Sequence, residues 1–375
     1  MSPYRKQVFV VSGKIVDYWY APDSDEKFEG VVECGSSLLI PANAMHGFFS
    51  LEESTLLYVL ENHFSAEFDR NIYWRSPELP FSFLSIPTHR MVTSAKDEAA
   101  PFWKAYDYLV FGSTGFLGSY AVTVLRAQGR SVFCSQLRLH EIAEIQNVIR
   151  QTRCKFVICA AGISGNPTTL WCEDHEKETF QVNLLQLLNL IEVTERAGVH
   201  LTVFGTALLY KPILPMIPIT EEVKPTLNNL VYVRLRVELE SHLHLYNHVL
   251  YLRVIYPVLG NGHPKCFLTK MKGRMDSVHN VPVAMTVMPD LFPLLSILVE
   301  KHVVGVINFV NTGTIFLPDF MRMFGVECKH DGDEKIGVEL CARKLSEASG
   351  RMVSSVRDAL GKIIANNSAG GASDF

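Results

Sequence analysis

The stretch Tyr108-Leu-Val-Phe-Gly-Ser-Thr-Gly-Phe-Leu-Gly118 joins an apolar run to three glycines. Its first four residues predict a buried strand, and Ser119 to Ala127 continue with helical spacing. Gly112 can take a tight turn, Gly115 lets backbone amides approach a pyrophosphate, and Gly118 lets the helix pack on the sheet. The stretch therefore predicts a strand, a phosphate loop and a helix whose N-terminus holds the pyrophosphate of a dinucleotide.

Glycine triplets also occur in turns and helix starts for conformational reasons alone. Here the helix closes at Gln128-Gly129, and further elements follow it in alternation. We expect strands over residues 131–134, 155–161 and 200–205, and helices over residues 139–151 and 174–197. This alternation predicts an α/β fold with a Rossmann-like, doubly wound parallel sheet.

The end of the second expected strand bears on the choice of cofactor. A carboxylate that binds the ribose 2'-hydroxyl of NAD is expected there, but none occurs before Glu141, and Arg138 is present instead. An arginine pairs with a 2'-phosphate, which a carboxylate would repel. The sequence favours NADP(H) over NAD(H), although Arg138 also fits a solvated charge at a helix start.

Composition narrows the class of protein and of partner. The chain has 375 residues, 48% of them hydrophobic and 20% charged, with a formal net charge of −4. No apolar run reaches the ~18 residues of a membrane span, and no Lys/Arg block suggests nucleic acid. The eight cysteines form no CxxC pair. We expect a soluble protein of the cytoplasm, organellar import remaining an alternative, that binds a small molecule and no metal.

The first sixty residues predict short strands at 7–11, 14–20, 30–33, 37–40 and 55–60, separated by turns and a polar stretch at 22–27. Such spacing is typical of an all-β sandwich or barrel. The Pro41–Phe48 turn, an expected strand at 71–74 and the Ser94-Ala-Lys-Asp97 tail resemble the later half of the nucleotide-sugar 3,5-epimerases, which are cupin-like barrels.

In that family a His held by an Asp removes a proton beside the ketone, and a Tyr acts as the acid. Asp97 matches the Asp, but this chain lacks the strand that carries the His, and His63 and Phe64 replace the tyrosine pair. We interpret residues 1–103 as a partial, non-catalytic barrel used for packing, for dimerisation or for a protein complex, the alternative being an active epimerase. His46 is interpreted as a structural turn histidine rather than a metal ligand.

Two later stretches carry a second resemblance. CAAGISGNPTTLWCEDHEKETFQVN, residues 159–183, and the stretch from Cys266 to Gly313 resemble signatures of the nucleotide-sugar 4-reductases of rhamnose synthesis. These are extended short-chain dehydrogenases/reductases and include the UDP-4-keto-6-deoxyglucose epimerase/reductases and the dTDP-4-dehydrorhamnose reductases. The likeness extends over residues 106 to about 360.

The resemblance implies a catalytic Thr206, a proton-donating Tyr232 and, four residues later on the same helix face, a cation that supports the Tyr. Arg236 stands where that family has Lys, and the two are not equivalent. Cys159 and Ile255 are further departures. The implied substrate-binding residues are Asn166, Trp171 and Arg253, and the implied cofactor-binding residues are Gly112, Ser113, Thr114, Gly115, Phe116, Leu117, Gly118, Arg138, Ala160, Ala161 and Gly162. Tyr232 and Thr206 also fit a surface aromatic and a strand-end hydroxyl.

Residues 335–364 show apolar residues at helical spacing and are expected to complete a small substrate lobe, and residues 366–375 have a disordered composition. The expected domains are thus the partial barrel at 1–103, the NAD(P)-binding reductase domain at 104–365, and the tail.

Two functions remain open. The first is NADPH-dependent reduction of a UDP- or dTDP-linked 4-keto-6-deoxy sugar, which the intact glycine loop favours. The second is a catalytically inactive relative that serves as a structural or regulatory subunit, an interpretation that the altered residues favour.

Overall fold

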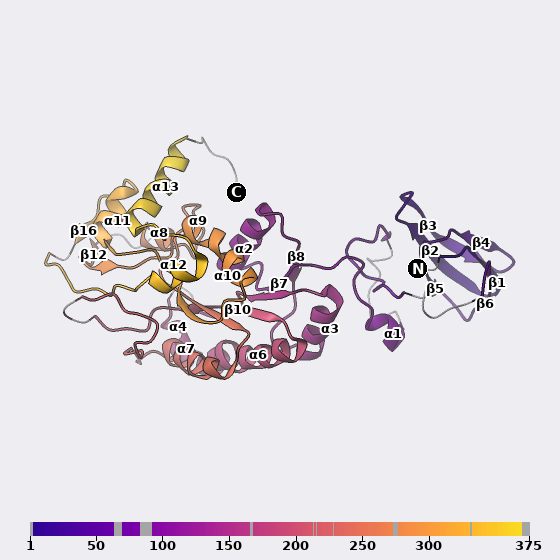
Figure 1. The fold of residues 1–375 in the computed structure, drawn as a ribbon, viewed down its shortest axis with the longest axis horizontal. Coiled ribbons are helices and arrows are strands. Elements are labelled where there is room, and N and C mark those ends of the chain that lie inside the picture. The colour runs from indigo at the N-terminus through magenta and orange to yellow at the C-terminus, as the bar shows by residue number, and fades with distance from the viewer. Residues whose placement is uncertain are drawn as a thin grey trace. The chain divides into compact units, whose positions relative to one another are not determined.

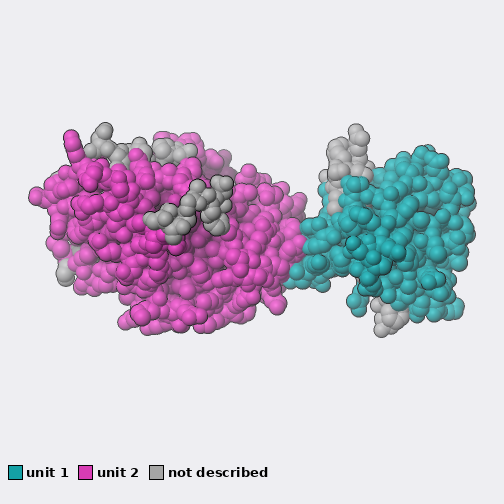
Figure 2. Space-filling model, turned by 90° about the horizontal axis from the view of Figure 1, so that it is seen from above, with its two compact units in different colours: residues 1–105, 147–153 teal, residues 106–146, 154–375 magenta. Residues whose placement is uncertain are grey.

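The computed structural model describes residues 3–63, 70–82, 92–165, 168–212, 214, 216–227, 229–272, 277–330 and 332–369. The chain divides into two compact units, coloured separately in Figure 2. Unit 1 comprises residues 1–105 and 147–153, and unit 2 comprises residues 106–146 and 154–375. Residues 147–153 therefore interrupt unit 2 in the sequence, because this end of a helix belongs to unit 1.

Unit 1 is built from two three-stranded antiparallel sheets, ordered β4-β1-β6 and β3-β2-β5. Their strands are β1 (Lys6–Ser12), β2 (Lys14–Ala21), β3 (Glu26–Glu33), β4 (Ser37–Ile40), β5 (Met45–Ser50) and β6 (Thr55–Leu60). The sequence predicts five of these strands. It misses β5, because Pro41, Asn43 and Gly47 are residue types typical of a turn. It also starts β3 four residues late. Gly47 is needed within β5 because the Tyr18 ring of β2 lies where a side chain would go.

Beyond the sheets, the chain of unit 1 is mostly irregular in its described parts. Residues 71–74 form no strand, contrary to the sequence prediction. The tail begins a short helix, α1 (Ala95–Glu98), whose first turn is capped by Ser94 through the Asp97 backbone N–H at 3.1 Å. Residues 147–153 close the unit, since Gln151 donates its side-chain amide to the Glu98 carbonyl at 2.9 Å.

Unit 2 is organised around a six-stranded sheet with the order β14-β11-β10-β9-β7-β8. All its pairings are parallel. The strands are β7 (Tyr108–Phe111), β8 (Val132–Ser135), β9 (Phe156–Cys159), β10 (His200–Thr206), β11 (Val249–Val254) and β14 (Gly305–Asn308). Figure 1 shows α6 and α7 along one face of this sheet and α2 and α10 along the other. The predicted Rossmann-like, doubly wound fold is confirmed.

The helices that accompany strands β7 to β11 are α2 (Phe116–Ala127), α3 (Ile142–Thr152), α4 (Trp171–Asp174), α5 (Glu176–Phe180), a π-helical turn η3 (Gln181–Leu185), α6 (Gln186–Ala197) and α7 (Val231–His242), which the 3₁₀ turn η4 (Leu243–Leu245) follows. In place of the single helix predicted over 174–197, the structure has α5 and α6 joined directly by the π-helical turn η3. α6 ends as predicted at Gly198, whose φ of +66° suits glycine.

The rest of unit 2 alternates short helices and bridges. It comprises α8 (Phe267–Lys272), β12 (Ser277–Val278), β13 (Pro282–Val283), α9 (Met288–Leu291), the 3₁₀ turn η5 (Phe292–Leu294), α10 (Leu295–Glu300), β15 (Ile315–Phe316), α11 (Leu317–Met323), β16 (Lys329–His330), α12 (Arg343–Ser349) and α13 (Val356–Ala369). The sequence prediction of helix over 335–364 is only partly right, because helix begins at Arg343 and breaks after Ser349. α13 continues to Ala369, and the last six residues of the expected tail lie outside the described residues.

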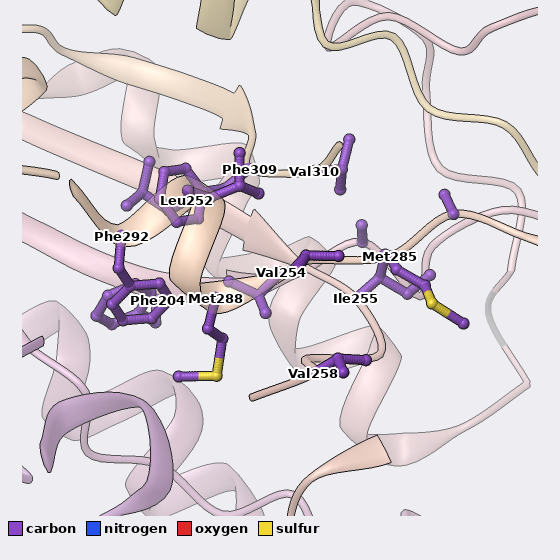
Figure 3. Packing of buried hydrophobic residues seen from close by; sticks show 14 of the residues in the cluster. Phe204, Leu252, Val254, Ile255, Val258, Met285, Met288, Phe292, Phe309 and Val310 are labelled. Atoms are coloured by element: carbon purple, nitrogen blue, oxygen red, sulfur yellow. The ribbon is translucent and has the colours of Figure 1, made fainter. Parts of the chain in front are cut away.

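Both faces of the sheet of unit 2 are packed with buried apolar residues, and one large cluster includes residues between the sheet and the helices on its α2 side. Figure 3 shows Phe204 of β10 and Leu252 of β11 gathered with Phe292, Met288 and Phe309. The Phe204 and Phe292 rings stack with centroids 5.6 Å apart. This packing holds the carboxyl ends of β10 and β11 in register, where the candidate site is found. Among the described helices, none combines the length and apolar character that crossing a bilayer requires.

Candidate active site

A cavity of about 610 Å³ opens at the carboxyl ends of the strands of unit 2. Side chains and backbone from five successive strand ends line it, in the spatial order β8, β7, β9, β10 and β11. This edge is where open parallel sheets bind their ligands. The lining includes Gly112 to Leu117, Ser135 to His140, Ala160 to Ile163, Phe204 to Thr206, Tyr232, Arg236, Val254 to Pro257, Lys265 and Lys270.

The glycine loop has the geometry that the sequence predicts. Gly112 has a φ of +71°, and a Cβ there would come within 2.5 Å of the Ala161 backbone nitrogen. A Cβ on Gly118 would overlap the Gly112 carbonyl, so this glycine permits α2 to pack on the loop. Gly115 is the N-cap of α2 and has open space in front of it, since a Cβ there would meet only the Gly112 oxygen, at 3.3 Å. The first turn of α2 therefore presents free backbone N–H donors to the cavity.

The end of β8 contributes the segment Ser135 to His140 to the cavity. Within it the Arg138 side chain is exposed, and its backbone N–H donates to the Glu141 carboxylate. The segment contains no Asp or Glu. The structure therefore brings Arg138 to the cavity edge beside the glycine loop, which is the arrangement that its proposed contact with a ribose phosphate requires.

Thr206 and Tyr232 meet in the same cavity from different elements. Thr206 is the last residue of β10, and its hydroxyl oxygen accepts the Leu208 backbone N–H at 3.1 Å, which leaves its own proton free to donate. Tyr232 lies in the first turn of α7. The start of α7 is held by Glu173 of α4, whose carboxylate accepts the Val231 backbone N–H at 2.8 Å. The acidic residue of the Trp-Cys-Glu stretch thus fixes the position of Tyr232.

Arg236 lies one turn after Tyr232, with its guanidinium carbon 5.6 Å from the centre of the Tyr232 ring. The side chain is buried, with 4% of its surface exposed. Its Nη2 donates to Asn183 Oδ1 at 3.2 Å and lies against Gly162, where a Cβ would come within 2.6 Å. Among the described residues, its Nε and Nη1 atoms have no hydrogen-bond partner. A permanent positive charge is therefore held beneath Tyr232.

Cys159, at the end of β9, is fully buried beside this charge. Burial raises the pKa of the thiol to about 11, although the Ala161 backbone and Arg236 favour the thiolate. The thiol is therefore neutral near pH 7 and packs as a small apolar group, which argues against a nucleophilic role.

Three of the predicted site residues lie outside the cavity. Gly118 packs behind the loop, and Trp171 stacks on the His175 ring with centroids 3.7 Å apart. Arg253 is buried with 1% exposure, and it donates to Glu240 Oε2 at 3.0 Å and to the Tyr210 hydroxyl at 3.0 Å. The geometry gives Arg253 no free donor face for a substrate phosphate. Asn166 lies outside the described residues.

The structure also brings forward residues that sequence reasoning passed over. Asn183, on the π-helical turn η3, accepts the Ile163 backbone N–H at 2.9 Å and donates to the Ile163 carbonyl at 2.6 Å while it also accepts from Arg236. A π-helical turn inside a longer helix often marks a functional site. The one signal for Asn183 in the sequence is its position at the end of the resembling stretch. Lys270 lies within the second resembling stretch, from Cys266 to Gly313, whereas Lys265 carries no such signal.

Unit 1 contains a buried histidine–aspartate contact that the sequence analysis missed. His46 lies on β5, not in a turn, and its Nε2 is 3.0 Å from Asp17 Oδ2 of the neighbouring β2. Burial lowers the pKa of His46, while Asp17 opposes that shift. Asp97 instead accepts the Ser94 hydroxyl at 2.6 Å. The described residues contain no cluster of three or more His, Cys, Asp or Glu side chains suited to a metal ion.

Both units match known families. Residues 108–262 match the NAD dependent epimerase/dehydratase family, and residues 2–105 match the dTDP-4-dehydrorhamnose 3,5-epimerase family. The chain is therefore similar to a segment of the 3,5-epimerase family followed by an NAD-dependent epimerase/dehydratase domain. This fusion, predicted from the two resemblances, is thereby confirmed.

Related proteins support the same assignment. The chain is 26% identical over 268 residues to a trifunctional UDP-glucose 4,6-dehydratase/UDP-4-keto-6-deoxy-D-glucose 3,5-epimerase/UDP-4-keto-L-rhamnose-reductase of Arabidopsis thaliana, covering 70% of this chain and 39% of that protein. It is 27% identical over 226 residues to a bifunctional dTDP-4-dehydrorhamnose 3,5-epimerase/dTDP-4-dehydrorhamnose reductase of the same plant, covering 59% of this chain and 75% of that protein. The chain thus spans about two fifths of the length of the trifunctional relative.

Solved structures share the fold of unit 2. A UDP-rhamnose synthase from Acanthamoeba polyphaga mimivirus superposes with a TM-score of 0.64 at 20% identity, over 69% of this chain and 99% of that one. A dTDP-4-dehydrorhamnose reductase from Bacillus anthracis, in complex with NADP, superposes with a TM-score of 0.59 at 15% identity, over 70% and 98% of the two chains. These likenesses concern the fold.

Proposed function

We propose that this chain is an NADPH-dependent reductase of a nucleotide-linked 4-keto-6-deoxy sugar and yields a rhamnose-type sugar. The observation that carries the proposal is the single cavity in which the glycine loop, Thr206 and Tyr232 come together. The relatives in Arabidopsis thaliana include UDP-4-keto-L-rhamnose and dTDP-4-dehydrorhamnose reductases, which supports this substrate class.

The residues present fit a dinucleotide. Gly112 and Gly115 leave backbone space that any Cβ would narrow, and the first turn of α2 offers N–H donors for a pyrophosphate. Ala160 to Gly162 would border its nicotinamide ribose, since they line the next strand end. When bound, the nicotinamide supplies the hydride that the reduction needs.

The chain's own residues would handle the proton. The Tyr232 hydroxyl donates a proton to the ketone oxygen, and the free Thr206 hydroxyl proton donates a hydrogen bond to the same oxygen. The Arg236 charge, 5.6 Å from the Tyr232 ring centre, stabilises the negative charge left on the phenol oxygen. Arg236 cannot give up a proton, so the phenol must be reprotonated by another route, such as solvent.

The cofactor preference is tested by titrating NADPH and NADH while fluorescence is recorded. Gly115→Val is the sharpest loop variant, because a Cβ at this position comes near one atom of the described protein, the Gly112 oxygen at 3.3 Å, and circular dichroism checks that the variant is folded. We expect Gly115→Val to abolish binding of both cofactors. Arg138→Ala should weaken NADPH binding by on the order of tenfold and leave NADH binding unchanged, because a charge-assisted pair with phosphate is lost.

Turnover is tested with NADPH and the 4-keto-6-deoxy sugar linked to UDP and to dTDP in parallel. We expect oxidation of NADPH by the wild type and almost none by Tyr232→Phe. The alternative is an inactive subunit of a larger assembly. Two observations favour it: Arg236 replaces the Lys of the resembling family, and the Nε and Nη1 groups of Arg236 lack hydrogen-bond partners among the described residues. A wild type no faster than Tyr232→Phe would reject the reductase and favour that alternative.

We propose that unit 1 is non-catalytic and mediates self-association. Its Asp97 carboxylate accepts from Ser94 and has no histidine to orient, among the described residues. The His46–Asp17 pair is buried, with side-chain exposures of 4% and 0%. A buried base of this kind cannot reach a substrate. The eight free cysteines fit a reducing compartment, and we expect the protein in the cytoplasm.

A further inference from the structure

The cavity of unit 2 has an excess of positive charge. Arg138, Arg236, Lys265 and Lys270 line it, whereas Glu178 is its single carboxylate among the described residues. A surface of this balance attracts a polyanion and raises its local concentration. A dinucleotide accounts for part of that charge, since its pyrophosphate lies at the glycine loop.

The cations are spread over both ends of the row of strands. Arg138 follows β8 at one edge, and the glycine loop follows the adjacent β7. Thr206 ends β10, farther along. Lys265 and Lys270 belong to the segment after β11, which lies beyond β10. In the order of the strands, Thr206 thus lies between the end of β11, which the lysine segment follows, and the ends of β7 and β8, where a dinucleotide would bind.

A second anion therefore needs a place on the β11 side, and Arg253 does not provide it. Arg253 is buried and its guanidinium is occupied by Glu240, Tyr210 and Asn308. Lys265 is exposed on the cavity rim, and Lys270 is half-buried on α8. A lysine is a compact point charge that suits phosphate recognition where no bidentate fit is imposed.

We propose that Lys265 and Lys270 bind the diphosphate of the nucleotide-sugar substrate, in place of the arginine that the sequence suggested. This inference rests on the proposed reductase function. It specifies which side of the cavity holds the nucleotide and orients the sugar toward Tyr232.

The segment that carries Lys265 also contacts the start of α2, where the cofactor pyrophosphate would bind. This contact gives Lys265 an alternative role. His263 stacks on Phe116 at the start of α2, with ring centroids 4.5 Å apart. Lys265 could on this ground serve the pyrophosphate of the dinucleotide instead. Lys270, on α8, does not share that contact, so the two lysines are tested separately as well as together.

The experiment measures binding of UDP, dTDP, uridine and NADPH by calorimetry to the full chain and to Lys265→Gln, Lys270→Gln and the double variant. Lys272→Gln is the matched control, because Lys272 ends the same helix, is exposed and does not line the cavity. We expect nucleoside diphosphate affinity to fall on the order of tenfold per lysine, since each removes a charge-assisted contact. Uridine and NADPH affinities should match those of the control.

The outcomes separate the two proposals. Diphosphate affinity that equals that of Lys272→Gln overturns the lysine assignment, and so does a loss confined to NADPH, which would assign the lysines to the cofactor. A wild type that binds NADPH but no nucleoside diphosphate also overturns it while leaving the cofactor site standing. A wild type that binds neither rejects the reductase function itself.

Discussion

At the scale of single residues, Arg236 is a buried cation one helical turn from Tyr232. A buried guanidinium without a carboxylate partner is costly, and two of its nitrogens lack any hydrogen-bond partner among the described residues. The groups around it are the Cys159 thiol, the Tyr232 and Tyr251 phenols and the Asn183 amide. Such a charge is retained at a cost to stability, and the group best placed to use it is the Tyr232 phenol.

We predict that Arg236→Met lowers the turnover number on the order of a hundredfold, because the positive charge beside the phenol is lost. Arg236→Lys should keep at least the wild-type rate, since an ammonium preserves the charge at that position. The two rates are compared at saturating NADPH and keto sugar. Equal rates for the Met and Lys variants would show that the charge plays no part.

At the scale of elements, the start of α7 depends on a residue that is distant in sequence. α7 has no side-chain cap from its own N-cap residue, Leu230. Glu173 of α4 supplies the missing acceptor to the Val231 N–H, one residue before Tyr232. A carboxylate at a helix N-terminus also interacts favourably with the helix dipole.

We predict that Glu173→Ala lowers the free energy of unfolding by about 1 kcal/mol and reduces turnover, because Tyr232 loses its fixed position. Glu176→Ala is the control, since Glu176 forms an exposed pair with Arg234 of the same helix as Tyr232, at 3.3 Å. Exposed pairs contribute little, so this control should change neither quantity. Urea unfolding and steady-state kinetics measure both variants, and identical behaviour of the two would contradict the capping role.

The pairing of β11 with α7 through Arg253 and Glu240 is a second element-scale feature. We predict that Arg253→Met costs about 3–5 kcal/mol of stability, because it leaves a largely buried carboxylate unpaired. Arg253→Met combined with Glu240→Leu should recover most of this loss. Urea unfolding measures stability, and UDP titration of folded protein should show unchanged affinity. A stable single variant with weakened UDP binding would instead restore the phosphate-binding role that the sequence suggested.

At the scale of the whole molecule, unit 1 has a sheet that is apolar on both faces. One face of β4-β1-β6 contributes Val8, Val10 and Ile40 to the core. The other carries Leu39, Leu57 and Val59, which are 51–58% exposed and lie opposite Gln7 and Phe9 in the strand register. Strands with apolar residues on both faces are normally covered on both. An uncovered face of this kind favours association.

We predict that the wild type self-associates and that Leu57→Lys with Val59→Lys yields a single-chain species, because charge on this face prevents its burial. Size-exclusion chromatography with light scattering gives the mass. Glu52→Lys, an exposed change outside the sheet, should leave the wild-type mass unchanged. A wild type that runs as a single chain would remove the basis for this interface.

Features that local rules govern could be predicted from the amino-acid sequence. The glycine loop, the strand and helix alternation and the Gly198 stop follow from backbone conformation and from periodicity over a few residues, and the structure reproduces them. Thr206 and Tyr232 came from resemblance, and the structure brings both to one cavity.

Which distant residues meet is a property of the tertiary structure alone. The fold pairs Arg253 with Glu240 instead of exposing it, places Asp17 against His46, sets Glu173 at the start of α7 and joins residues 147–153 to unit 1. The physical reason is that a charged or polar side chain acts through its partner, and partners brought together by strand pairing and helix packing leave no periodic signal in the sequence.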